Sequence, residues 1–403
     1  MTADFFAGNR LKLMRSLGSS PVVMAAYTQL QRGNDAAFTF EQEANFWWLT
    51  GIESADWQLI IDGSRKKSWL VAPEVDEVHQ VFDGSLRPEE AIAISGVDAV
   101  ITRTEAEEML AELARHHAVV FTLGDDPHAQ YYDFTRNPAP DILKRRLGRL
   151  FADVRGLRQE ISKLRAIKQP EEIAAMEKAI TLTVGAFNHV REHLSDFRHE
   201  YEVEAEFSYY FRRHGALGHA YDPIVAAGGH ACTLHYSSNN GPLKKGSLLL
   251  LDIGARHQGY AADITRTYAI GRATVRQAAV HRVVAEAQRQ IIQQLRPGLS
   301  IEEYHETVDE LMKDALLSLG LMKGRDDTTN YHRYFPHSIS HGLGIDVHDS
   351  LGGPAMLEPG MVLTVEPGIY IPEESIGVRI EDDILITDTG YRNLSGALST
   401  DLA

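Results

Sequence analysis

Two aspartates lie on the arms of one apolar segment in the second half of the chain. Residues 248–270 read LLLLDIGARHQGYAADITRTYAI, where a polar stretch ending in glycine separates two apolar arms, which predicts an antiparallel hairpin. The midpoint of the polar stretch lies between His257 and Gln258. Asp252 and Asp263 occupy mirror positions about it, and opposite residues of an antiparallel pair project from one face. The two carboxylates should repel each other unless one is protonated or a cation lies between them. The alternative to a cation site is that one aspartate is a turn or edge residue and the pairing is accidental.

Histidines are concentrated in one later segment. Residues 334–348 read YFPHSISHGLGIDVH, in which His337, His341 and His348 lie among glycines and small residues that let a ligand approach closely. A further histidine, His235, is expected two or three residues beyond a strand of small residues in IVAAGGHACTLHY. A single histidine in such a place is more often a hydrogen-bonded core residue than a catalytic one.

Two acidic residues lie within apolar strands near the C-terminus. Glu366 is expected at the end of an apolar strand within residues 361–370. Arg379 and Glu381 lie on the next predicted strand, 377–386, and residues two apart share a strand face. A glutamate in such surroundings needs a partner that compensates its burial.

These residues form a set of four carboxylates and one imidazole without a thiolate. Oxygen-rich ligands suit Mn²⁺, while Zn²⁺ and Co²⁺ also accept the mixture. Two divalent ions would balance the four negative charges, activate a water molecule near neutral pH and polarise a scissile carbonyl. The set predicts a hydrolase with two divalent ions; a structural zinc site would use fewer carboxylates. The members of the set are Asp252, Asp263, His341, Glu366 and Glu381.

Composition sets wider limits on the function. The 403 residues are 44% hydrophobic, which suits two domains with a full-sized core. The net charge of -16 argues against a nucleic-acid-binding protein, which needs a basic face. The only cysteine is Cys232, and neither a signal peptide nor a membrane span is expected from the apolar runs. These features predict a cytoplasmic protein with no membrane partner.

The elements that position the candidate residues fall into two predicted domains. Residues 1–160 alternate strands and helices without a catalytic cluster, which predicts a supporting α/β domain. The chemistry lies in 161–403, where a long helix starts at Pro170 with acidic residues in its first turn. The strands expected in the first domain are 21–27, 57–61, 69–71 and 119–123, with a helix at 104–116. The helices expected in the second domain are 171–194, 201–214, 274–295 and 301–319.

Several of these segments resemble the signature segments of the pita-bread-fold metallopeptidases. The motifs are LDIG, GYAADITRTY, FPHSISHGLGIDVHD, LEPGMVLTVEPGIY and GVRIEDD, and they look most like the proline-specific branch, the Xaa-Pro aminopeptidases and Xaa-Pro dipeptidases. The segment FTFEQEANFWWLTGIESADWQLII resembles the N-terminal domain of the same enzymes. The resemblance implies an α/β (α+β) chain in which a creatinase-like α/β domain precedes a pita-bread catalytic domain.

The resemblance also implies a role for each metal ligand. Asp252 would bind one metal ion, and His341 and Glu366 would bind the other. Asp263 and Glu381 would bridge both ions.

Further roles follow from the same resemblance. Glu366 would help to activate the attacking water, and His235 and His348 would orient the substrate carbonyl and stabilise the tetrahedral intermediate. Arg379 would brace a ligand carboxylate. Positions near the substrate pocket, for which packing is the alternative, are Tyr221, His337 and Tyr370.

The implied substrates are proline-containing peptides. An Xaa-Pro bond is a tertiary amide without an N–H, and its ring fixes φ, so it needs a dedicated site. The short stretch HDSLGGPAMLE carries no arginine that could bind the carboxylate of a dipeptide, which favours an aminopeptidase. A dipeptidase remains the alternative if Arg333 or a partner subunit supplies that cation, and a non-catalytic binding protein is the rival from another class. A homodimer or homotetramer is expected.

Overall fold

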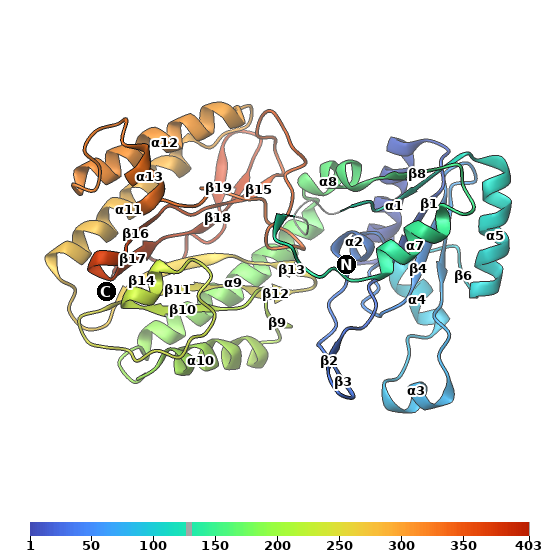
Figure 1. Ribbon diagram of the computed structural model, residues 1–403, viewed down its shortest axis with the longest axis horizontal. Coiled ribbons are helices and arrows are strands. Elements are labelled where there is room, and N and C mark those ends of the chain that lie inside the picture. Colours follow the sequence, from blue (N-terminus) through green and yellow to red (C-terminus); the bar gives the residue numbers. More distant parts are fainter. Residues whose placement is uncertain (126–130, 403) are drawn as a thin grey trace. The chain divides into compact units, whose positions relative to one another are not determined.

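The computed structural model describes residues 1–125 and 131–402, which form two compact units, Met1–Leu164 and Arg165–Ala403 (Figure 1). In the described part of the chain, no helix is both long enough and apolar enough to cross a membrane.

The first unit is built on a six-stranded mixed sheet with the strand order β6-β5-β4-β1-β7-β8. Strands β1, β4 and β5 pair antiparallel, whereas β6, β7 and β8 join the sheet in parallel. The strands predicted in this region are confirmed. The strand bounds are β1 (Val22–Ala25), β4 (Gln58–Asp62), β5 (Lys67–Val71), β6 (Ala99–Ile101), β7 (Val119–Thr122) and β8 (Asp153–Gly156), with a separate ribbon of β2 (Gln31–Gly33) and β3 (Ala36–Ala37).

Helices pack on this sheet through apolar residues and one buried arginine. The core beside α5 and α7 includes Leu110 and Leu147. Arg10 on α1 donates to the carbonyls of Leu49 and Ser95 and so ties three helices together. The helices are α1 (Ala3–Leu17), α2 (Ala44–Thr50), α3 (Glu77–Phe82), α4 (Pro88–Ser95), α5 (Arg103–His116), α7 (Ala139–Leu147) and α8 (Arg158–Ala166).

The second unit contains short antiparallel sheets and two pairs of long helices. Strands β10-β11-β14 form one sheet, β15-β18-β19 another, β9-β12-β13 a third, and β16 pairs with β17. The strands are β9 (Gly218–His219), β10 (Ile224–Ala227), β11 (Leu248–Ile253), β12 (Ala255–His257), β13 (Tyr260–Ala261), β14 (Ile264–Ala269), β15 (Val362–Val365), β16 (Gly368–Ile371), β17 (Ile376–Arg379), β18 (Asp382–Ile386) and β19 (Tyr391–Asn393). The helices are α9 (Pro170–Glu192), α10 (Glu200–Arg213), η1 (Gly228–Cys232), α11 (Val275–Gln294), α12 (Ile301–Ser318), α13 (Thr328–Tyr334) and η2 (Pro372–Glu374).

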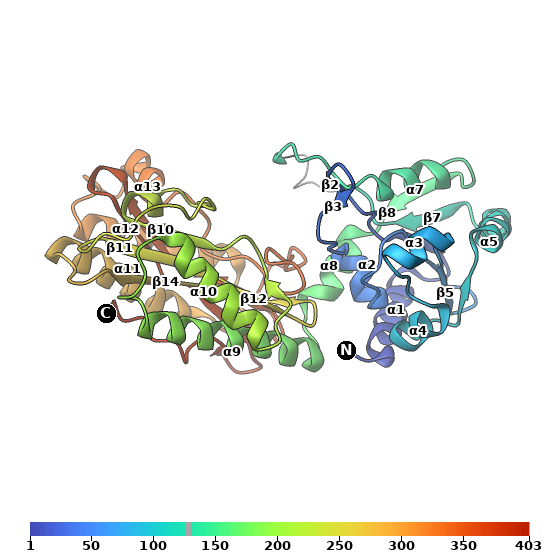
Figure 2. The same ribbon diagram turned by 90° about the horizontal axis from the view of Figure 1, so that it is seen from below.

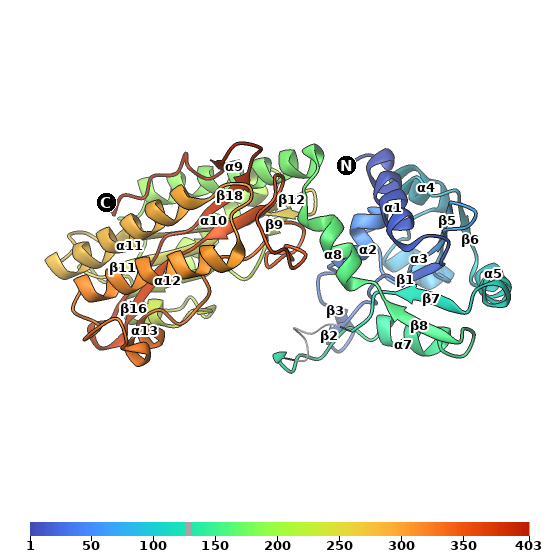
Figure 3. The ribbon, with the colours of Figure 1, turned by 90° about the horizontal axis from the view of Figure 1, so that it is seen from above.

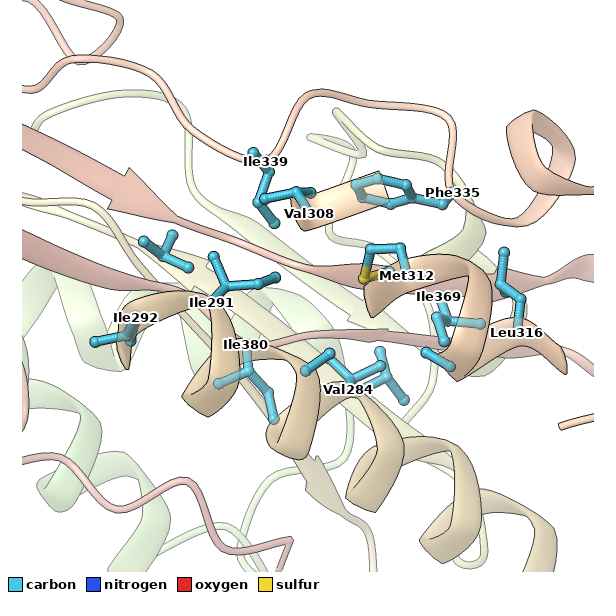
Figure 4. Packing of buried hydrophobic residues seen from close by; sticks show 14 of the residues in the cluster. Val284, Ile291, Ile292, Val308, Met312, Leu316, Phe335, Ile339, Ile369 and Ile380 are labelled. Atoms are coloured by element: carbon cyan, nitrogen blue, oxygen red, sulfur yellow. The ribbon is translucent and has the colours of Figure 1, made fainter. Parts of the chain in front are cut away.

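The two helix pairs cover opposite sides of these strands. Helices α9 and α10 lie nearest the viewer in Figure 2, and α11 and α12 in Figure 3. The first pair packs through Phe187 and Phe207 on residues of β11 and β14. The second pair packs through Ile291 and Met312 against Ile369 of β16 and the buried Ile380 (Figure 4). The strands that carry the candidate site are therefore buried on both sides.

The predicted hairpin forms, but its register differs from the prediction. Asp252 lies opposite Thr265, so the expected direct opposition of Asp252 and Asp263 is wrong. The turn residues are Gln258 and Gly259, with φ of 49° and 82°, as a two-residue hairpin turn requires, so the turn centre lies one residue later than expected. This moves the pairing by two positions. A shift of two leaves every side chain on its face, whereas a shift of one would reverse it.

The strand predicted over 377–386 is two strands. Strand β17 ends at Arg379 and pairs with β16, whereas β18 begins at Asp382 and pairs with β15 and β19. Glu381 lies between them, and its N–H donates to the carbonyl of Thr265 at 3.0 Å. The prediction that Arg379 and Glu381 share the face of one continuous strand is therefore wrong, because the chain changes partners between them.

Candidate metal centre and active site

Two aspartates of the hairpin meet at one tyrosine hydroxyl. Asp252 is the second-last residue of β11, and Asp263 directly precedes β14. Both are almost fully buried. The hydroxyl of Tyr221 lies 2.5 Å from Oδ1 of Asp252 and 2.6 Å from Oδ1 of Asp263. The carboxylates thus point together even though they are not directly opposite.

Glu381 and His341 join the aspartates from other segments. The hydroxyl of Thr265 donates to Oε2 of Glu381 at 2.7 Å. Nε2 of His341 lies 3.4 Å from Oδ2 of Asp263. One ligand atom each from Asp263, His341 and Glu381 lies within 4.8 Å of the others, which is close enough for a shared metal ion.

Glu366 completes the cluster from the residue after β15. Its Oε1 lies 3.6 Å from Nε2 of His341, and its Oε2 lies 3.7 Å from Nδ1 of His337. The other ring nitrogen of His341, Nδ1, is 2.9 Å from the carbonyl of Gly342, so Nε2 is the nitrogen that faces the carboxylates. All five residues predicted as metal ligands therefore lie in one contiguous group.

The electrostatics of this group fit a site for cations. Burial raises the pKa of Glu366 to about 7, with Asp263 and Asp252 adding to the effect and His341 opposing it. Burial, with the charges of Asp263, Glu366 and Asp252 adding to it, raises the pKa of Glu381 well above its ordinary value. Burial lowers the pKa of His341, but the hydrogen bond and charge of Asp263 outweigh it and raise that pKa to about 9. Divalent ions bound here would compensate this concentration of negative charge.

Arg379 links the carboxylates to a second group of side chains. It is buried and donates through NH2 to Oδ2 of Asp252 at 2.5 Å and through Nε to Oγ1 of Thr265 at 3.2 Å. Its NH1 donates to the hydroxyl of Tyr370 at 2.8 Å. That hydroxyl lies 2.9 Å from Nε2 of His337, whose pKa burial lowers to about 4. The predicted brace and two of the predicted pocket residues therefore lie in one hydrogen-bonded chain.

The two remaining histidines are exposed. The ring of His348 lies 4.3 Å from the ring of His341, measured between centroids. His235 is close enough for its charge to lower the pKa of His337. The prediction that His235 lies two or three residues beyond a strand is wrong, because β10 ends at Ala227 and η1 intervenes. Exposure does not fit the alternative of a buried core residue that was given for His235.

Some residues that hold the site were not singled out from the sequence. Thr265 contacts both Glu381 and Arg379; it lies two residues after Asp263, so strand alternation could have placed it on the same face. Glu200, at the start of α10, is fully buried. Its carboxylate accepts from Tyr236 and from the N–H groups of Ala227 and Gly241, and so anchors the segment that carries His235. No spacing in the sequence indicates these contacts of Glu200.

Comparison with known proteins gives matches over nearly the whole chain. Residues 174–388 match the family described as metallopeptidase family M24, and residues 6–121 match the aminopeptidase P N-terminal domain. The chain is 34% identical over 409 residues to the Xaa-Pro aminopeptidase of Escherichia coli (strain K12), covering 94% of this chain and 91% of that protein. It is also 34% identical to Xaa-Pro aminopeptidase 3 of Homo sapiens, covering 91% of this chain and 76% of that protein.

Solved structures give the same result. A putative aminopeptidase P from Bacillus anthracis superposes with a TM-score of 0.91 at 30% identity, covering 100% of this chain and 97% of the other. Aminopeptidase P from E. coli, solved with the inhibitor Pro-Leu, superposes with a TM-score of 0.87 at 31% identity, covering 100% and 96% of the two chains.

Proposed function

This chain belongs to metallopeptidase family M24 and carries an aminopeptidase P N-terminal domain, and from this premise we propose that it releases the first residue of peptides whose second residue is proline. The observation that carries the proposal is the buried group of carboxylates and one imidazole around Asp263. We assign residues 1–160 to a supporting domain and 161–403 to the catalytic domain.

Two divalent ions per chain, with Mn²⁺ preferred and Zn²⁺ or Co²⁺ accepted, suit this ligand set. When bound, the ions would lower the pKa of water and polarise the scissile carbonyl. The assignment rests on the family resemblance and on the charge of the group. Asp252 would serve one ion, His341 and Glu366 the other, and Asp263 and Glu381 both.

Glu366 is the candidate for proton transfer. One of its carboxylate oxygens would take a proton from the attacking water and return it to the proline nitrogen as that nitrogen leaves. In the metal-free protein its pKa is raised by burial to about 7, so the carboxyl can change its protonation state near neutral pH. The adjacent imidazole of His341 faces the same carboxylate.

His235 and His348 are the candidates for holding the substrate carbonyl. Both are exposed beside the buried group, where an N–H from either ring could donate to the carbonyl oxygen as negative charge develops on it. Arg379 would keep Asp252 ionised and oriented. Tyr221, His337 and Tyr370 would line the pocket for the proline ring, since their hydroxyl and ring groups border the same carboxylates.

The relatives support an aminopeptidase over a dipeptidase. The curated relatives in E. coli and Homo sapiens are both named Xaa-Pro aminopeptidases. The segment between His348 and Glu358 has no arginine for the free carboxylate of a dipeptide. Comparing kcat/KM for Xaa-Pro and Xaa-Pro-Xaa peptides tests the choice. The longer peptide should be preferred, and exclusive hydrolysis of the dipeptide would favour a dipeptidase instead.

We also propose a homodimer or homotetramer located in the cytoplasm. The family resemblance supports the oligomer, and the single cysteine suits a reducing compartment. Light scattering coupled to size-exclusion chromatography tests the first part, and a fully active monomer would contradict it. Cell fractionation tests the second part.

A further inference from the structure

A buried ion-pair cluster holds the residue that follows His348. Asp349 is almost fully buried, with Oδ1 2.9 Å from NH2 of Arg165 and Oδ2 3.2 Å from Nζ of Lys168. Both cationic side chains are also almost fully buried. The N–H of Ser350 donates to Oδ1 at 2.8 Å. The carboxylate is thus held on both oxygens, and we call Arg165, Lys168 and Asp349 the clamp.

The clamp is fixed to the body of the catalytic unit. Arg165 lies at the end of α8 and Lys168 lies between α8 and α9, and the ammonium of Lys168 donates to the carbonyl of Arg165 at 2.7 Å. The backbone N–H of Lys168 donates to the carbonyl of Gly360 at 2.8 Å. These hydrogen bonds fix the positions of the two cations, and Asp349 forms ion pairs with both.

The segment between His341 and His348 leaves space for the carboxylate of Asp349. The N–H of Asp349 donates to the carbonyl of Gly342 at 2.9 Å, which closes the segment into a loop. A Cβ on Gly344 would lie only 2.0 Å from Oδ2 of Asp349, so any side chain there would displace the carboxylate. His341 and His348 lie at the two ends of this loop, with their rings 4.3 Å apart.

His348 itself is exposed and lies on a segment that is neither helix nor strand. The residues that anchor the loop contribute to its position relative to His341, and Asp349 is its immediate neighbour in the chain. We propose that Asp349, held by Arg165 and Lys168, is a positioning residue that fixes the imidazole of His348 at the reacting carbonyl. This inference rests on the proposed role of His348.

The charges support a rigid clamp. Burial opposes ionisation of Asp349, but the charges of Arg165 and Lys168 overcome it and hold the pKa of that carboxyl below its ordinary value. Removing one partner from such a group leaves a buried charge uncompensated, which destabilises the segment that the group holds. A displacement of about 1 Å at a catalytic group can lower the rate by about a hundredfold.

A double-mutant cycle separates positioning from general stabilisation. His348→Ala should lower kcat by about a hundredfold, as loss of a donor to the developing charge does. Asp349→Asn in the intact protein should lower kcat by about tenfold or more, with KM changed by less than about threefold. In the His348→Ala background the same change should lower kcat by less than about twofold, because the group it positions is gone. Mn²⁺ content by elemental analysis should stay the same in all folded variants.

The matched control is Asp346→Asn. Asp346 also contacts NH2 of Arg165, at 2.9 Å, and lies on the same loop, but it is exposed. Its kcat should stay within about twofold of the wild type, since water can replace an exposed carboxylate and Asp349 still pairs with Arg165. Lys168→Gln serves as a second variant should Asp349→Asn not fold, and it should show the same dependence on His348.

The outcomes distinguish the inference from its premise. Normal kcat in Asp349→Asn, or losses that multiply in the double variant, would overturn the positioning role while leaving His348 as a catalytic residue. Normal kcat in His348→Ala would contradict the proposed role of His348 itself and remove the basis of the inference.

Discussion

At the scale of single residues, Asp263 connects the parts of the candidate metal centre. Its Oδ1 is 2.6 Å from the hydroxyl of Tyr221, and its Oδ2 is 3.4 Å from Nε2 of His341. Its N–H donates at 3.2 Å to Asp383, a buried carboxyl whose pKa burial raises well above the ordinary value. The site therefore concentrates acidic groups that only protons or cations can compensate.

Replacing this aspartate tests its proposed bridging role. Asp263→Asn removes one negative charge while keeping the shape of the side chain, so kcat at saturating Mn²⁺ should fall by about a hundredfold or more, with the melting temperature of the metal-free protein little changed. Asp388→Asn, at an exposed aspartate, is the matched control and should behave as wild type. Turnover of Asp263→Asn close to wild type at saturating Mn²⁺ would refute the assignment.

The protonation of the metal-free site gives a prediction about pH. The pKa of His341 is raised from 6.5 to about 9, and that of Glu366 from 4.5 to about 7. Both groups hold protons more tightly when folded, so their contribution to stability is present at low pH and is lost as pH rises through these values. Metal ions bind the deprotonated ligands, so binding releases protons and strengthens as pH rises.

The melting temperature of the metal-free protein should therefore fall between about pH 6 and about pH 8.5, and the increase caused by Mn²⁺ should be larger at the higher pH. Thermal unfolding with and without Mn²⁺ measures both effects, and titration calorimetry in buffers of different ionisation enthalpy counts the released protons. A stabilisation by Mn²⁺ that does not change with pH would contradict this account.

At the scale of elements, the long helices and the existence of the hairpin could be predicted because their signals are local. Helix α9 begins at Pro170, as the proline and the acidic first turn indicated. The register could not be predicted, because the polar stretch does not show which two residues adopt positive φ. The break before Glu381 could not be predicted either, because neither glycine nor proline marks it and only the partner strands change.

Gly254, in the link between β11 and β12, gives a test at this scale. A Cβ there would lie 1.8 Å from the carbonyl oxygen of Ala262 and 2.8 Å from the ring of Tyr221. Gly254→Ala should therefore push apart the two arms that carry the aspartates and cost about 1–3 kcal/mol of stability, as overpacking does, with reduced activity. Urea unfolding and kcat measure the two effects.

The matched control is Gly8→Ala. Gly8 lies within α1, and an added Cβ would meet nothing within 4 Å. This change should be neutral or stabilise by up to about 1 kcal/mol. An unchanged free energy of unfolding in Gly254→Ala would show that the two arms can separate without cost.

At the scale of the whole molecule, the five candidate metal ligands could be proposed from the sequence because each lies in a recognisable motif. The clamp was not, because Lys168 and Asp349 are 181 positions apart and neither lies in a pattern that indicates the other. Membership of family M24 covers the catalytic unit, and the aminopeptidase P N-terminal match covers most of the first unit. The chain therefore combines the two domains of the aminopeptidase P relatives.

Cleavage of Xaa-Pro bonds by this chain should depend on divalent ions held by the group around Asp263. The most direct measurement titrates chelator-treated protein with Mn²⁺ and follows release of the first residue from an Xaa-Pro-Xaa peptide, with Xaa-Ala-Xaa as the matched substrate. We expect no release without metal, a rise that saturates at two ions per chain, and little release from the alanine peptide. Full activity in the chelated protein or with one tightly bound zinc ion, or equal cleavage of the two peptides, would contradict the account.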